Sequence, residues 1–229
     1  MTIIHHGRRR AVAALGAAGA ALLLPGCAIP VAPVRPLNPA LAPRKGDTWR
    51  YAYTSGWRNV PPQQVAVTCV DVGTGVRDRV TLVDSAVGDE RSFLGPLELV
   101  ERPVVPGFAL VELSPYLAAF EGTDLGQNYA VRMPPADWGT AWSGMARAVG
   151  TEKVQTPAGT FDAVRIDMSG SRLFLRGQMD TAIDPVWLRA TAWYAPAARR
   201  VVRFTHDTWA FADQPLSRDR YELTSLKLT

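Results

Sequence analysis

Cysteine and histidine are scarce in this sequence, with 2 and 3 copies among 229 residues. Zinc and copper sites usually take about three or four such side chains as ligands, and no HExxH or CxxC motif is present. The acidic residues are also too scattered for a calcium loop. We therefore expect the protein to hold no metal and no cofactor.

The sequence motifs of common enzymes are absent as well. No serine lies in a GxSxG motif, and residues 73–75 (GTG) precede a strand-like segment rather than the helix of a phosphate-binding loop. His206 and Asp207 could form a base and its partner, but adjacent residues of a strand point to opposite faces. The distant carboxylates of a glycosidase would leave no spacing signal. We expect no catalytic residues and a protein that is not an enzyme.

Positive charge outside the first residues is nearly balanced by negative charge. The formal net charge of +4 includes Arg8, Arg9 and Arg10, and without them it is +1. A nucleic-acid-binding surface needs clustered basic residues, so the composition argues against a nucleic-acid partner.

The first 26 residues have the pattern of an export signal. Residues 11–24 form a run of fourteen uncharged, mostly apolar residues, shorter than the roughly 20 that span a bilayer. The run is followed by Pro25-Gly26-Cys27, and the stretch Leu24 to Cys27 resembles the lipobox of bacterial lipoproteins. That resemblance implies cleavage before Cys27 and its acylation, with residues 1–26 as the signal peptide. An ordinary secretory signal with a chance cysteine is the alternative, and the export route stays open.

Acyl chains on Cys27 would make the membrane a partner of the protein. Each buried methylene contributes about 0.8 kcal/mol, so several chains anchor a soluble domain stably. Ala28 follows the cysteine, which resembles the default pattern for outer-membrane lipoproteins. We expect an anchored domain on the periplasmic side of the outer membrane, with the inner membrane less favoured. Cys69 then has no disulfide partner, and its apolar neighbours indicate a buried residue rather than a reactive thiol.

Residues 27–45 are predicted to be a tether between this anchor and the folded domain. Proline recurs there at nearly every third position, which matches the three residues per turn of polyproline II. At about 3.1 Å per residue, the segment could hold the domain up to roughly 55 Å from the membrane. The prolines are Pro30, Pro33, Pro36, Pro39 and Pro43.

Residues 46–229 are predicted to form one β-rich domain. Apolar and polar residues alternate with a period of two, and no long amphipathic helix or internal repeat is present. We expect a mainly β fold in which a single curved antiparallel sheet forms a half-barrel or open barrel with little helix. Turn residues at 73–75, 157–160 and 195–198 indicate hairpins. The strands are expected at 48–54, 63–71, 76–87, 97–102, 108–113, 129–133, 146–156, 161–169, 186–194, 199–211 and 221–228.

Part of the second half is similar to a recurrent pattern of uncharacterised bacterial envelope proteins. The matching residues are 151–166 (TEKVQTPAGTFDAVRI), 193–196 (WYAP) and 200–203 (RVVR). Those proteins resemble the open β-barrels of the LolA, LolB and LppX type, in which a curved antiparallel sheet wraps a helix or a lipid. The resemblance lies in turns and strand faces, so it implies a fold rather than an activity. Here no long helix follows that could plug such a barrel.

Tryptophan is frequent, with 7 copies, and the aromatic residues allow two interpretations. They either fill the core of a curved sheet or line a cavity for an acyl chain or another apolar ligand. The candidate lining residues are Trp138, Trp142, Phe161, Trp193 and Phe204.

Together these features predict a non-enzymatic lipoprotein that binds an apolar ligand or an envelope protein partner through its curved sheet. The alternative is a structural or assembly subunit of an envelope complex, whose domain has no ligand cavity. A cavity lined by aliphatic and aromatic side chains favours the first function. A filled core with an exposed apolar patch favours the second.

Overall fold

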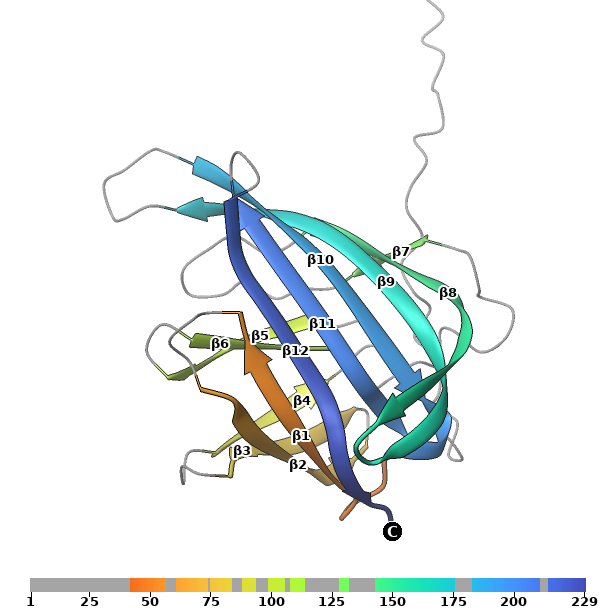
Figure 1. The fold of residues 1–229 in the computed structure, drawn as a ribbon. Coiled ribbons are helices and arrows are strands. Elements are labelled where there is room, and N and C mark those ends of the chain that lie inside the picture. Colours follow the sequence, from red (N-terminus) through yellow and green to blue (C-terminus); the bar gives the residue numbers. More distant parts are fainter. Residues whose placement is uncertain are drawn as a thin grey trace, which may run out of the picture.

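The structure is a computed structural model in which the described segments form a β domain (Figure 1). Among these segments, no helix has the length and apolar composition needed to cross a membrane. Cys27, the predicted signal peptide and the first part of the predicted tether lie outside them. The described residues are 42–56, 61–73, 75–83, 88–93, 99–105, 108–113, 128–131, 143–175, 183–210 and 214–229.

Strands make up nearly all of the regular structure within these ranges. The exception is one short 3₁₀ helix, η2 (Pro196–Ala198). The strands are β1 (Thr48–Ser55), β2 (Gln63–Val72), β3 (Val76–Leu82), β4 (Gly88–Phe93), β5 (Leu99–Val105), β6 (Phe108–Leu113), β7 (Asn128–Val131), β8 (Ser143–Thr156), β9 (Gly159–Leu175), β10 (Ile183–Ala195), β11 (Arg200–Ala210) and β12 (Gln214–Lys227).

Ten of the strands form one antiparallel sheet in the order β4-β3-β2-β1-β12-β11-β10-β9-β8-β7, while β5 and β6 pair separately. Within the large sheet every strand lies beside its neighbour in sequence, except where β1 meets β12. Figure 1 shows this sheet strongly curled. The predicted fold class is confirmed: the protein is mainly β, and its curved antiparallel sheet forms a half-barrel with little helix in the described part.

One face of the sheet is buried and the other is largely exposed, as a period of two requires. In β1, Trp49, Tyr51 and Tyr53 are buried, whereas Arg50 is exposed. Buried and more exposed positions alternate in the same way along β3 and most of β11. The apolar side chains of the buried face pack into one core cluster, and removing their surface from water is the main force that holds the sheet together.

The ion pair between Asp78 and Arg200 shows how tightly the sheet curls. Asp78 lies on β3 and Arg200 on β11, four strand spacings apart, which is about 19 Å in a flat sheet. Asp78 Oδ2 and Arg200 Nη2 are nevertheless 2.8 Å apart, and both side chains are buried. On the same face, Trp49 Nε1 donates a hydrogen bond to Ala198 O at 2.8 Å. The buried face is therefore the concave face.

Two turns that the sequence predicts form the ends of long hairpins. Between β8 and β9, Gly159 has φ = 137°, a conformation that glycine adopts more easily than other residues. Between β10 and β11, Arg199 follows η2 with φ = 53°. The tip of the first hairpin also reaches β12, because Ala158 N donates a hydrogen bond to Leu223 O at 3.2 Å.

The strand predicted at residues 76–87 is wrong in its extent. Strand β3 ends at Leu82, and β4 pairs with β3 as a separate strand, with Val76 opposite Phe93. The sequence of β4, GDERSF, lacks an apolar alternation, so a period of two does not identify it as a strand, and β4 lies at one end of the ten-stranded order. The strands predicted at 97–102 and 108–113 correspond to β5 and β6, which form their own two-stranded sheet.

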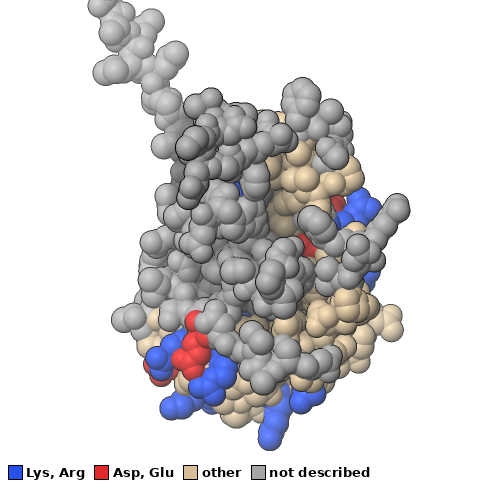
Figure 2. All heavy atoms as spheres, turned by 90° about the vertical axis from the view of Figure 1, so that its left-hand side faces the viewer, with Lys and Arg blue, Asp and Glu red and all other residues tan. Residues whose placement is uncertain are grey.

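Charged side chains of both signs lie on the molecular surface. Figure 2 shows Lys and Arg interspersed with Asp and Glu at the lower end of the molecule. Several of the surface charges are paired: Arg79 Nη2 is 2.6 Å from Glu90 Oε1, and Lys153 Nζ is 2.9 Å from Asp162 Oδ1. Such exposed pairs contribute little to stability, but they keep the local charge balanced.

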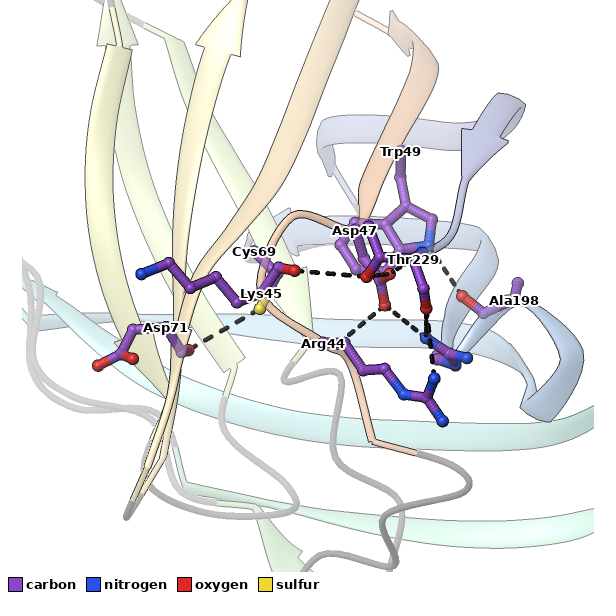
Figure 3. Close-up of polar contacts among 9 residues, drawn as sticks. Arg44, Lys45, Asp47, Trp49, Cys69, Asp71, Ala198 and Thr229 are labelled. Carbon is purple, nitrogen blue, oxygen red and sulfur yellow. Dashed lines mark hydrogen bonds and ion pairs between the residues drawn. The ribbon is translucent and has the colours of Figure 1, made fainter.

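Asp47 connects the chain before β1 to both β11 and β12 (Figure 3). Its fully buried carboxylate accepts hydrogen bonds from the backbone N–H groups of Thr229 at 2.7 Å and Arg44 at 2.8 Å. The guanidinium of Arg199 donates a further bond at 3.0 Å. Residues 42–45, which the sequence assigns to the tether, therefore contact the folded domain.

We expect Asp47→Asn to destabilise the protein by about 2 kcal/mol at pH 7, because charge-assisted hydrogen bonds are lost. Burial alone would raise the pKa of Asp47, but hydrogen bonds from Thr229, Arg44 and Arg199 lower it below its ordinary value. A lowered pKa in the folded state means that the stabilisation is complete above the unfolded pKa of about 4 and is lost as pH falls through the folded value. Urea unfolding of both proteins from pH 7 to pH 2 should show two stability curves that converge in acid. Parallel curves would contradict this role.

Cys69 is expected to resist alkylation in the folded protein. Its side chain is buried, as the sequence predicts, and burial together with the negative charge of Asp78 raises the pKa of the thiol to about 12. Since the thiolate is the reactive species, iodoacetamide at pH 8 should label native Cys69 more than about a hundredfold more slowly than the urea-unfolded chain. Mass spectrometry of the peptide that contains Cys69 measures both rates. Equal rates would show that the thiol is accessible.

Candidate functional site

Aromatic rings cover one half of the concave face, where β1, β12 and β11 lie side by side. Tyr53 is opposite Tyr221, which is opposite Phe204 on the next strand. The ring centroids of Tyr53 and Tyr221 are 4.9 Å apart, and those of Tyr221 and Phe204 are 6.1 Å apart. All three side chains are buried, so they form a continuous apolar wall.

Alanine side chains lie on the adjoining part of the same face, on β8 and β10, and the larger Ile166 and Met168 of β9 lie between them. Ala192 lies opposite Phe204, and Ala190 lies opposite His206. At Gly170 even a methyl group would come within 2.8 Å of Ser143 O, so the backbones approach closely there. We call the four buried alanines the alanine patch: Ala146, Ala148, Ala190 and Ala192.

Polar side chains meet at the border between the aromatic wall and the alanine patch. The polar cluster consists of Ser55, His206 and Asp219, which come from β1, β11 and β12. Strand register places Asp219 opposite both of the others. Ser55 Oγ donates a hydrogen bond to Asp219 Oδ1 at 3.0 Å, and His206 Nδ1 is 3.4 Å from Asp219 Oδ2.

His206 is the unusual member of the polar cluster. Its ring is 3% exposed and stacks beside Phe204 with the ring centroids 6.4 Å apart. Within the described part of the chain, neither Nε2 nor Nδ1 has a hydrogen-bond partner, although Nδ1 lies 3.4 Å from Asp219 Oδ2. Leaving a buried polar atom unsatisfied costs about 1–3 kcal/mol, which a polar group placed against Nε2 would recover.

Tyr53 adds a neutral hydroxyl beside the polar cluster. Burial, followed by the negative charge of Asp219, raises the pKa of this phenol far above its ordinary value. Tyr53 therefore keeps its proton at every physiological pH and serves as a hydrogen-bonding group rather than as a base.

The polar cluster combines a hydroxyl, an imidazole and a carboxylate from three neighbouring strands. The hydroxyl of Ser55 is directed at the carboxylate of Asp219, to which it donates at 3.0 Å. Among the described residues, no group of three or more His, Cys, Asp or Glu side chains has the geometry of a metal site.

The structure separates the residues that the sequence predicts to line a ligand cavity. Phe204 lies on the concave face beside the polar cluster. Trp193 lies on the opposite face, where its Nε1 donates to Glu152 and Arg203 stacks 5.7 Å from its ring. Phe161 lies near the tip of the β8–β9 hairpin, opposite Val154. Trp138 and Trp142 are outside the described residues, as is Cys27.

Sequence reasoning considered His206 together with Asp207 and missed its contact with Asp219. Asp207 points to the exposed face, where its Oδ1 accepts a hydrogen bond from Arg218 at 3.2 Å. His206 and Asp219 both occupy buried positions of their strands. The register of β11 against β12, which the sequence does not show, brings the two side chains together.

Comparisons with known proteins give a likeness of shape. No protein-family model and no curated protein matches the chain. It is similar to the crystal structure of a candidate lipoprotein from Parabacteroides distasonis ATCC 8503, with 14% identity, a TM-score of 0.47, and coverage of 82% of this chain and 98% of that chain. It is also similar to a candidate exported protein with a YmcC-like fold from Bacteroides fragilis NCTC 9343, with 14% identity, a TM-score of 0.42, and coverage of 81% and 97%.

Proposed function

We propose that this protein is an outer-membrane lipoprotein, anchored on the periplasmic side through acyl chains on Cys27, that binds an apolar ligand on the concave face of its sheet. The ligand carries a polar group that meets the polar cluster. The proposal assigns the protein a binding role and no catalytic one.

The observation that carries this proposal is the pairing of the alanine patch with an unsatisfied imidazole. Four buried alanines on β8 and β10, with Ile166 and Met168 of β9 between them, give this part of the concave face a surface of aliphatic side chains. Beside them, His206 Nε2 lacks a partner among the described residues although its ring is buried. An apolar chain with one hydroxyl or carboxyl group would suit both features, because it packs against aliphatic side chains and supplies a hydrogen bond.

The anchor is supported by two parts of the chain. Residues 24–27 resemble a lipobox, and the proline-rich segment that follows leads directly to the Asp47 contacts at the start of β1. Since Asp47 binds backbone and side-chain donors from three segments, a pull on the tether would be distributed over the sheet rather than applied to β1 alone.

Ligand binding can be tested on the full-length protein carrying Cys27→Ser, purified from the periplasm. We expect native mass spectrometry to detect a co-purified apolar molecule, and a fluorescent long-chain fatty acid to bind after that molecule is removed. Ala192→Phe fills the alanine patch and should abolish both signals. Thr205→Phe, which places the same ring on the opposite face of β11, is the matched control.

Folding of each variant is checked by circular dichroism, and Ala192→Val replaces Ala192→Phe if the larger ring prevents folding. Unchanged binding in a folded alanine-patch variant would overturn the proposed site. Absence of any apolar ligand from the parent protein would overturn the binding function and favour the assembly subunit instead.

The anchor has its own test. Wild-type protein should incorporate radioactive palmitate and remain with the outer-membrane fraction, whereas Cys27→Ser should do neither. A palmitate-free wild-type protein, or a Cys27→Ser variant that stays membrane-bound, would contradict the lipid anchor.

A further inference from the structure

A second concave feature lies on the exposed face of the sheet, opposite the alanine patch. It is a hollow of about 300 Å³ formed by β7, β8, β9 and β10. We name it the arginine hollow because Arg147, Arg165 and Arg189 line it. Its polar lining is completed by Asn128, Asp167, Ser169 and Thr191.

One of the three guanidinium groups is already neutralised. Arg165 Nε and Nη2 donate to the two oxygens of Asp167 at 2.9 Å and 3.1 Å. Thr191 Oγ1 also donates to Asp167 Oδ1, at 3.1 Å. Asp167 is therefore occupied by groups of the hollow itself, and it holds Arg165 in a fixed orientation.

The other two guanidinium groups have no acidic partner in the described part of the chain. Arg147 lies opposite Asp167 on β9, and Arg189 lies opposite Ser169 on the other side of the same strand. Their strands are two spacings apart, which is about 10 Å, so the long side chains can reach a common group between them. Arg189 is also held above the ring of Trp209, with its Cζ atom 5.6 Å from the centroid.

The ratio of arginines to carboxylates in the arginine hollow differs from that around other arginines of the exposed face. Elsewhere many arginines are paired with a carboxylate, as Arg203 and Arg220 are with Glu222 at 2.6 Å and 3.1 Å. In the arginine hollow, three arginines face one acidic residue, which leaves two positive charges inside a concave surface. Concave sites concentrate the field of such charges and attract anions.

We propose that the arginine hollow binds a phosphate group, either of a free phosphate ester or of a phospholipid head group. Planar guanidinium forks bind phosphate oxygens through paired hydrogen bonds, which favours two arginines on either side of the ligand. Ser169 and Asn128 add neutral hydrogen-bonding groups at the rim. Ala146 and Ala190 of the alanine patch also line the hollow, but the three arginines lie on the exposed face, so phosphate binding does not depend on the ligand proposed for the concave face.

Calorimetric titration of the full-length Cys27→Ser protein with inorganic phosphate and with glycerol 3-phosphate tests the proposal. Each of Arg147→Gln and Arg189→Gln should weaken binding at least about tenfold, because one charged hydrogen-bonding group is lost. Arg50→Gln, which removes one exposed arginine from β1, is the matched control and should leave the affinity within about twofold.

Vesicles distinguish the two sources of phosphate. Binding to phosphatidylglycerol vesicles without binding to the small phosphates assigns the hollow to a lipid head group, and the reverse assigns it to a free ester. No binding to any of the three, binding of an acidic peptide instead, or equal losses in Arg50→Gln and in the hollow variants would overturn the proposal. Ala192→Phe should not change phosphate binding, so failure of one site is not confused with failure of the other.

Discussion

Replacing Arg200 with methionine is expected to lower the free energy of unfolding by about 3–5 kcal/mol, because the carboxylate of Asp78 stays buried without this guanidinium. The two groups are 2.8 Å apart, and the side chains of Arg200 and Asp78 are 6% and 0% exposed. Urea denaturation at pH 7 measures the loss, with the slope of the transition compared between variants to verify two-state unfolding.

A double variant distinguishes the cost of leaving Asp78 without Arg200 from the net contribution of the ion pair to stability. The double variant Asp78→Leu/Arg200→Met should recover most of the lost stability, because apolar residues of similar size often replace a buried ion pair without penalty. A double variant that is as unstable as the sum of its two single variants would show that the two side chains act independently.

Trp49→Ala should have an effect of similar size, about 3–5 kcal/mol, because it leaves a large cavity at the closed side of the curl. Trp49 is fully buried, its Nε1 donates to Ala198 O at 2.8 Å, and Arg200 Cζ lies 4.8 Å from its ring centroid. Thermal and urea unfolding of the purified protein measure the change.

Two further variants divide the contribution of this tryptophan. Trp49→Phe keeps a ring but loses the donor, and the unsatisfied carbonyl of Ala198 should cost about 1–3 kcal/mol. Trp193→Ala, at a partly exposed position, should cost much less than Trp49→Ala. If Trp49→Ala and Trp193→Ala lower the free energy of unfolding equally, the stability of the core does not depend on Trp49 in particular.

The local features of the fold were accessible from the sequence. Residues 157–160 predict a tight turn because proline presets φ at one turn position and glycine accepts a positive φ at a later one, and the structure has that turn between β8 and β9. Strand β4 was missed because Gly88–Phe93 is polar and gains its place from pairing with β3. The pairing of β1 with β12 could not be read either, since nothing local to Thr48 specifies a partner near Lys227.

The candidate site was predicted less completely, for reasons of strand geometry. Phe204 and Trp193 were grouped because both are aromatic residues of neighbouring strands. Residues 187–193 pair with residues 209–203 in an unbroken register, so Ala192 lies opposite Phe204, and Trp193 lies opposite Arg203 on the other face. A register shift comes only after Trp193, between Trp193 and Tyr194, and it explains why Val201 and Val202 are both buried. His206 and Asp219 come together only through the register of β11 and β12.

The pairing of β1 with β12 joins the first and last strands of the described chain, and this affects how the molecule folds. Thr224 Oγ1 donates to Arg50 O from a position 174 residues later in the chain. Contacts between residues this far apart in the sequence cost loop-closure entropy when they form, and they slow folding. Until the last strand is synthesised, one edge of β1 stays open, so a nascent chain would offer it to other strands. A holdase chaperone that covers this edge should therefore raise the yield of folded protein.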